Sequence, residues 1–198
     1  MTPDLEGYFR RQTRPQRQEF TRVAIAAAAD GIPTIGPVLG GLLTVLIRFG
    51  AVRRVLDLGA GNGYSALYLA EGMGGEGEII ALERDPRRAV AARQNLAHSS
   101  VRTNVLIGAA QEVLPGLGAP FDLILLDLDK TDYLYALEHC ARLLRPGGML
   151  VIDNTGFAEA EPFNAALAAD ARFYSVNLLC LLPGHSPEND GVALAVRH

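Results

Sequence analysis

The chain has 198 residues, of which 49% are hydrophobic and 20% are charged, and its formal net charge is −4. This composition excludes a disordered chain, and the small negative charge gives no reason to expect a nucleic-acid or membrane partner. The length fits one domain over 1–198, with N-terminal helices in 1–50 and a sheet core in 51–198. The sequence shows no signal-peptide pattern and no apolar stretch long enough to span a bilayer, so we expect a cytoplasmic protein.

Short apolar runs alternate with helical periodicities, which predicts an α/β fold: a parallel sheet with helices on both faces. We expect helices near 15–29 and 37–49 before the first strand. The expected strands are 53–57, 78–83, 103–107, 121–127 and 148–153, and the helices between them lie near 64–72, 86–97, 109–115 and 131–144. A helix near 159–169 follows, and the apolar runs 172–184 and 191–197 around "HSPEND" predict a terminal antiparallel hairpin.

A glycine-rich loop, "LDLGAGNGYS", follows the first expected strand and opens a helix. Gly59, Gly61 and Gly63 let the backbone turn sharply and approach a ligand closely. The dinucleotide fingerprint G-x-G-x-x-G would need a third glycine at Tyr64, and Asp57 would disfavour a pyrophosphate beside the loop. The loop therefore favours a cationic ligand over a dinucleotide, and a tight structural turn is the simpler alternative.

Glu83 ends the second expected strand, at a position where a carboxylate can accept two hydrogen bonds from a ribose diol. Alone it could be an ordinary surface carboxylate. Together with the loop it indicates a ligand that has a ribose and a positive centre but no pyrophosphate, which points to S-adenosyl-L-methionine (SAM).

Acidic and amide side chains follow the fourth and fifth expected strands: Asp127 and Asp129, then Asp153 and Asn154. Because parallel strands end at the same edge of a sheet, we expect these groups to lie together where α/β sheets bind ligands. Two carboxylates and an amide oxygen suit Mg²⁺ or Ca²⁺. A helix N-cap at Asp127 and a turn at Asp153-Asn154 are the alternatives for the single residues.

Lys130 is the only lysine beside seventeen arginines. Arginine stays protonated, whereas a lysine close to a divalent cation can lose its proton and act as a base. The sequence therefore predicts a catalytic base at Lys130, with chance survival of one lysine as the alternative.

The motifs "VLDLGAGNGYSALYLA", "IIALERDP", "FDLILLDLDKTDY" and "LLRPGGMLVIDN" resemble the cation-dependent O-methyltransferases, the family of catechol and caffeoyl-CoA O-methyltransferases. The resemblance extends from about residue 34 to the C-terminus. It implies a seven-stranded, Rossmann-like class I methyltransferase fold whose last two strands form an antiparallel hairpin. It also implies methyl transfer from SAM to a hydroxyl of a small catechol-like or hydroxylated aromatic molecule, and a homodimer as in bacterial and plant relatives.

The resemblance also implies roles for individual residues. Lys130 takes the place of the catalytic base, and Asp127, Asp153 and Asn154 that of the ligands of a divalent cation, usually Mg²⁺. The positions that match the family's SAM site are Ile35, Asp57, Gly59, Ala60, Gly61, Gly63, Ser65, Glu83, Arg84, Ala110, Gln111, Asp127 and Asp129. Among them, Asp57, Ser65 and the Ile35 carbonyl meet the methionine part, Glu83 the ribose, and Ala110 and Gln111 the adenine.

The sequence departs from the family on both sides of the substrate. The segment after Asn154 is short, and "PGHSPENDGVAL" is longer than the usual turn before the last strand. We therefore expect this longer segment to cover part of the substrate pocket in place of the shortened one. Phe157 could form a pocket wall, although a core position is the simpler interpretation. The four histidines have no ligand spacing and receive no role. A non-catalytic SAM-binding protein and, less favoured, a nucleotide-dependent dehydrogenase are the alternative functions.

Overall fold

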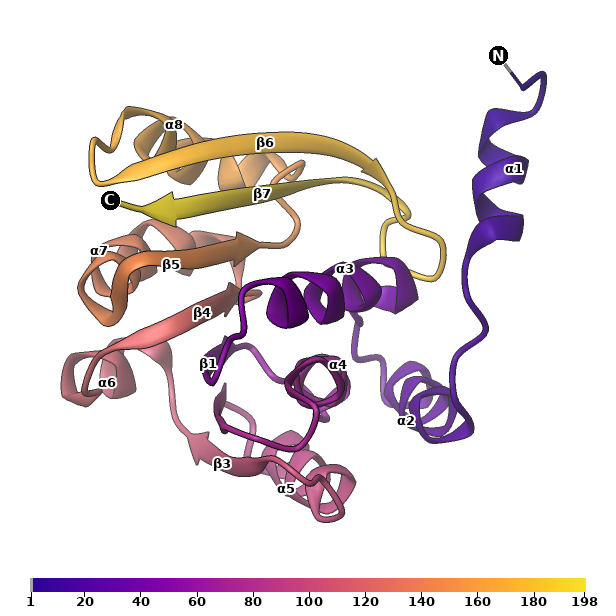
Figure 1. The fold of residues 1–198 in the computed structure, drawn as a ribbon, viewed down its shortest axis with the longest axis horizontal. Helices are drawn as coiled ribbons and strands as arrows, with labels where there is room; N and C mark the ends of the chain where they lie inside the picture. Colours follow the sequence, from indigo (N-terminus) through magenta and orange to yellow (C-terminus); the bar gives the residue numbers. More distant parts are fainter. Residues whose placement is uncertain (1) are drawn as a thin grey trace.

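A computed structural model describes residues 2–198, and its seven strands form one sheet in the order β3-β2-β1-β4-β5-β7-β6 (Figure 1). The strands are β1 (Arg54–Leu58), β2 (Glu78–Glu83), β3 (Arg102–Ile107), β4 (Phe121–Leu126), β5 (Leu144–Ile152), β6 (Phe173–Leu181) and β7 (Asn189–Arg197). The strands β1 to β5 run parallel to one another, and β7 pairs antiparallel with both β5 and β6. The predicted parallel sheet with a terminal antiparallel hairpin is confirmed.

Helices cover both faces of this sheet, as predicted. They are α1 (Leu5–Gln12), α2 (Gln18–Ala29), α3 (Gly36–Phe49), α4 (Tyr64–Met73), α5 (Pro86–Leu96), α6 (Ala110–Val113), α7 (Tyr133–Leu143) and α8 (Glu161–Ala169). Figure 1 shows α3, α4 and α5 on one side of the sheet and α6, α7 and α8 on the other.

The apolar side chains divide into two cores because successive residues of a strand point to opposite faces. In β1, Val55 packs into the core beneath α2 to α5, whereas Leu56 and Leu58 pack into the core beneath α6 to α8. Both faces are covered, so the central strands are apolar throughout. Asp57 interrupts this pattern as a fully buried carboxylate on the α4 face.

The structure differs from the expected elements in three places. Helix α1 was not predicted; its side chains are polar or exposed, and it is stabilised locally by the Asp4 N-cap. The helix expected to start at 131 begins with a 3₁₀ turn, Lys130–Asp132, and becomes α-helical at Tyr133. The strand expected at 148–153 starts earlier, at Leu144, and the pairing of β5 with β4 shifts register near this start.

The carboxyl ends of β1, β2, β4 and β5 meet at one edge of the sheet, and the loops that follow them carry the predicted site residues. Among residues 2–198, no helix combines the length and apolar character that a membrane crossing requires.

Candidate active site

A cavity of about 630 Å³ opens at this edge of the sheet. Its lining includes most of the predicted site residues: Gly59, Gly61, Glu83, Arg84, Ala110, Gln111, Asp127, Asp129, Lys130, Asp153 and Asn154. A small recess of about 20 Å³ lies beside it and is lined by Ile35, Ala60 and Ser65 among others. Asp57 lies beneath the glycine loop and Gly63 is part of this loop, and neither residue lines the cavity or the recess. The structure thus brings together residues from separate segments that the sequence predicted to share a site.

The glycine loop passes very close to the end of β4. Gly59 has φ +99°, and a Cβ at this position would lie 1.8 Å from the backbone oxygen of Asp127. Gly63 has φ +91° and is the N-cap of α4. Glycine adopts this left-handed backbone conformation readily at both positions, and at Gly59 it also leaves room for the Asp127 backbone. Steric constraints therefore explain the glycines at these two positions.

Asp57 is a buried acceptor beneath the loop. Its Oδ2 accepts a hydrogen bond from Ser65 Oγ at 2.7 Å, while its Oδ1 is buried and has no hydrogen-bond partner in the protein. Burial raises the pKa of Asp57 to about 7, against the lowering effect of the Ser65 hydrogen bond. A buried carboxylate oxygen without a donor is costly, and a cationic amine next to the recess would satisfy it.

Glu83 is held by backbone donors at the end of β2. Its two carboxylate oxygens accept N–H groups of Gly61 and Asp85, each at 2.8 Å. Each oxygen retains a second lone pair toward the cavity, as a ribose diol requires. Nearby, Arg84 pairs with Asp129 at 2.6 Å, and the Gln111 side chain donates to Asp132 at 2.7 Å.

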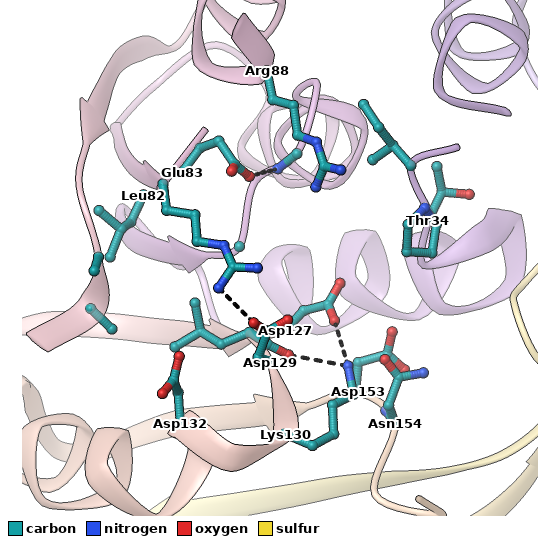
Figure 2. A pocket seen from close by; sticks show the side chains of 18 of the residues that line it. Thr34, Leu82, Glu83, Arg88, Asp127, Asp129, Lys130, Asp132, Asp153 and Asn154 are labelled. Carbon is teal, nitrogen blue, oxygen red and sulfur yellow. Dashed lines mark hydrogen bonds and ion pairs between the residues drawn. The ribbon is translucent and has the colours of Figure 1, made fainter. Parts of the chain in front are cut away.

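The opposite end of the cavity holds the predicted cation ligands and the lysine. Lys130 Nζ lies 3.5 Å from Asp127 Oδ1 and donates to the Leu128 carbonyl at 3.1 Å. Figure 2 shows the Lys130 amine beside Asp127, Asp153 and Asn154. The rings of Tyr133 and Phe157 lie 5.4 and 5.6 Å from this amine. The amine therefore points into the cavity between carboxylates and aromatic rings.

Asn154 is oriented by Asp190, a residue of β7. Its Nδ2 donates to Asp190 Oδ2 at 2.7 Å, and Asp190 Oδ1 accepts the N–H groups of Gly156 and Gly191. With its nitrogen held in this way, the amide has its oxygen free to bind a cation. Asn154 also has φ +53°, a left-handed conformation that asparagine tolerates better than most residues.

Two carboxylates lie close together at this end, beside Lys130 and His185. The pKa of Asp127 is raised to about 7, first by burial and then by the neighbouring Asp153, although Lys130 lowers it. Carboxylate and amide oxygens in this arrangement are the donors that Mg²⁺ and Ca²⁺ prefer. The residues therefore fit a divalent cation.

His185, from the loop between β6 and β7, closes this end of the cavity. Its Nε2 lies 2.8 Å from Asp153 Oδ2 and 3.0 Å from Asp153 Oδ1, and its Nδ1 lies 2.6 Å from the Pro187 carbonyl. Burial alone would lower the pKa of His185, but the hydrogen bond and charge of Asp153 outweigh it and raise the pKa overall.

Comparison with known proteins gives the family. A family model described as O-methyltransferase matches residues 18–180. The chain belongs to this O-methyltransferase family. It is 36% identical over 139 residues to a catechol O-methyltransferase of Mycobacterium tuberculosis, covering 69% of this chain and 59% of that protein. It is 32% identical over 191 residues to a catechol O-methyltransferase of Niastella koreensis, covering 85% of each.

Solved structures agree with this assignment. The O-methyltransferase from Bacillus cereus in complex with SAH superposes with a TM-score of 0.86 at 25% identity, and the match covers 98% of this chain and 97% of that one. The predicted methyltransferase fold is therefore confirmed.

Several residues that line the cavity of this O-methyltransferase, or that contact its lining, were not predicted. His185 was assigned no role because histidine spacing gave no signal; the unusual length of its loop was the one available hint. Asp190 was also missed, because only the pairing of β7 with β5 brings it to Asn154. Phe157 does line the cavity, so the interpretation of a pocket wall fits better than a core position. The remaining lining residues come mainly from the segment before α3 and the segment after β3: Ile32, Pro33, Thr34, Gly108 and Ala109.

Proposed function

We propose that this O-methyltransferase transfers the methyl group of SAM to a hydroxyl of a small catechol-like aromatic molecule, with the help of a divalent cation, Mg²⁺ being the expected one. One observation carries the proposal: a single cavity joins the glycine loop and Glu83 at one end to Lys130, Asp127 and Asp153 at the other. A methyl donor and a hydroxyl acceptor must meet in such a shared space.

The first end fits SAM, which when bound supplies a methyl group on a positively charged sulfur. The unpartnered Oδ1 of Asp57 would accept from the amine of the methionine part, near the recess lined by Ile35, Ala60 and Ser65. Glu83 would accept from the ribose hydroxyls. The SAH complex of the related Bacillus cereus enzyme supports this assignment.

The second end fits a divalent cation, which when bound would lower the pKa of a coordinated substrate hydroxyl. Asp127, Asp153 and the Asn154 oxygen would hold it. Asp190 keeps the Asn154 amide in position, and the Tyr133 hydroxyl donates to the Asp153 carbonyl at 3.0 Å, which anchors the end of β5.

Lys130 would take the proton of the acceptor hydroxyl. Its amine lies in the cavity lining, 3.5 Å from Asp127 Oδ1, and it is not one of the proposed cation ligands. The ring of Phe157 lines the cavity 5.6 Å from the amine and would favour a flat aromatic acceptor. The names of the catechol O-methyltransferase relatives support this class of substrate.

The test is a screen of catechols, caffeoyl esters and hydroxylated flavonoids with SAM, with and without Mg²⁺, in which methylated product is measured by mass spectrometry. We expect product from a vicinal diol only when Mg²⁺ is present. Binding of SAM without product from any diol would favour a non-catalytic SAM-binding protein. The expected homodimer is tested separately by light scattering.

A further inference from the structure

The loop of residues 182–188, which joins β6 to β7, is firmly built against the rest of the chain. A Cβ on Gly36 would lie 2.8 Å from the backbone of Gly184 and His185, so the loop packs directly on the start of α3. Glu188 accepts the Gly184 N–H at 2.8 Å and pairs with Arg10 of α1 at 2.5 Å. The position of His185 is therefore determined by the fold on both sides of the loop.

The contacts of His185 determine the state of its ring. The Pro187 carbonyl can only accept a hydrogen bond, so Nδ1 carries a proton. Nε2 faces both oxygens of Asp153, which as a carboxylate also only accepts, so without a cation this nitrogen carries a proton that a bound cation would replace. The His185 side chain is almost fully buried, at 1% exposure. Histidines that bind metals through one ring nitrogen usually donate the other N–H to a carbonyl or carboxylate in this way.

The spacing of these atoms also matches a coordination shell. Two ligands at about 2.1 Å from a metal ion, in adjacent octahedral positions, lie about 3.0 Å from each other. The Nε2 of His185 lies 2.8 and 3.0 Å from the two Asp153 oxygens and 3.5 Å from the Asn154 amide nitrogen. The ring nitrogen is therefore at the spacing of adjacent ligands from Asp153, and it lies next to the side chain of Asn154.

We propose that His185 is a fourth protein ligand of the divalent cation, in addition to Asp127, Asp153 and Asn154. Asp190 is close enough to belong to the same cluster, since its ligand atom lies within 4.8 Å of those of Asp153 and His185. We assign it a positioning role because both of its oxygens already accept N–H groups from Asn154, Gly156 and Gly191.

A nitrogen ligand changes which metal ions the site favours. Mg²⁺ prefers oxygen ligands throughout, whereas imidazole suits transition metals such as Co²⁺, Ni²⁺ and Zn²⁺. The loop that the family usually keeps short would in this chain add affinity for a transition metal at the expense of selectivity for Mg²⁺. This inference rests on the cation site of the proposed function.

The test uses Co²⁺ as the probe on the intact protein. A paramagnetic Co²⁺ ion bound to Nε2 shifts the exchangeable Nδ1 proton far from the diamagnetic region of the NMR spectrum. We expect one such resonance in the wild type, and it should disappear when H₂O is exchanged for D₂O. The resonance should also be absent in H185Q. It should be retained in H98Q, the matched control, which changes an exposed histidine. Labelling the wild type with ¹⁵N-histidine splits the same resonance and needs no variant that could misfold.

Calorimetry gives a second readout. We expect H185Q to weaken Co²⁺ binding at least about tenfold, a usual effect at metal centres, and to change Mg²⁺ binding much less. The wild type and H185Q must be compared because a site with only oxygen ligands also binds Co²⁺ more tightly than it binds Mn²⁺ or Fe²⁺. Tight Co²⁺ binding by the wild type alone is therefore no evidence for a nitrogen ligand.

The outcomes separate the inference from the proposed function. Stoichiometric Co²⁺ binding without the shifted proton, or with the proton unchanged in H185Q, shows that His185 only forms an ion pair with Asp153 and overturns the inference alone. Magnesium-dependent methyl transfer would then still stand. Absence of any divalent cation binding overturns both.

Discussion

The two ends of the cavity are built in different ways. We call the end with the glycine loop, Asp57 and Glu83 the SAM end, and the end with Lys130, Asp127 and Asp153 the acceptor end. At the SAM end the contacts join residues that are close in sequence: Ser65 bonds to Asp57 eight residues away, and Glu83 bonds to Gly61 across 22 residues. At the acceptor end the contacts reach further, from Asp153 to His185 across 32 residues and from Asn154 to Asp190 across 36. The first end depends on one strand-loop-helix unit and its neighbouring strand, whereas the second depends on the docking of β7 against β5.

The two ends also differ in charge. The SAM end offers two buried carboxylates, Asp57 and Glu83, which suit a ligand with one positive centre and a ribose diol. The acceptor end places Asp127 and Asp153 next to Lys130 and His185, so that two negative and two potentially positive side chains share a small space. We therefore expect changes at one end to leave the other largely intact, and the following predictions test this separation.

Metal removal should have the largest effect. Treatment with EDTA is expected to abolish methyl transfer, and added Mg²⁺ to restore it, because the substrate hydroxyl then loses the cation that would lower its pKa. SAM binding, measured by calorimetry, should persist in EDTA. Turnover that is indifferent to the chelator would contradict the cation site.

Lys130→Ala should lower kcat by about 10²- to 10⁴-fold, the usual contribution of a positioned base. SAM affinity should change little, because the lysine belongs to the acceptor end. Lys130→Arg is the control: it keeps the positive charge but cannot give up its proton, so it should be nearly as inactive. An active arginine variant would show that charge alone is needed.

Asp57→Asn should weaken SAM binding by roughly 10- to 100-fold, as expected when a charge-assisted hydrogen bond is lost. Asp30→Asn, a change of an exposed carboxylate, is the matched control and should bind SAM normally. Equal affinity in both variants would remove Asp57 from the SAM site.

The same substitution has a pH-dependent effect on stability. The pKa of Asp57 is raised to about 7, so the folded protein retains this proton at pH values where the unfolded chain has lost it. The free energy of unfolding therefore falls as pH rises from about 4 to about 7. Without SAM, Asp57→Asn should be more stable than the wild type at pH 8, by an amount on the order of a few kcal/mol, and should lose this advantage near pH 4. Urea unfolding at the two pH values measures the difference.

Phe157→Ala should have the smallest effect, a rise of roughly two- to tenfold in KM for an aromatic acceptor with little change in kcat. The ring lies beside Lys130 and would contribute only packing and stacking energy. Phe49→Ala removes a ring that is 92% exposed at the end of α3 and serves as the matched control. Identical KM values in the two variants would exclude Phe157 from the substrate wall.

Much of the architecture could be predicted because it depends on local patterns. Apolar runs of strand length between helical periodicities were enough to place β1 to β5 in a parallel sheet and to predict the terminal antiparallel hairpin of β6 and β7. Because parallel strands end at the same edge of the sheet, the sequence also predicted that Asp127, Asp153 and Asn154 lie together with Lys130. The role of the glycines near Asp57 could also be predicted, since Gly59 and Gly63 meet the steric needs of a single tight turn.

Helix α1 and the roles of His185 and Asp190 could not be obtained in this way. Helix α1 has only eight residues, and its short apolar stripe of Leu5, Tyr8 and Phe9 is exposed and packs into neither core. His185 and Asp190 acquire their partners only when the β6–β7 hairpin adds to the sheet beside β5 and its loop packs on α3. Sequence periodicity specifies which residues point to the same face of one element. Contacts between distant segments depend instead on how the elements pack against one another. The acceptor end of this enzyme depends on such packing, so its full set of contacts could not be predicted from the sequence.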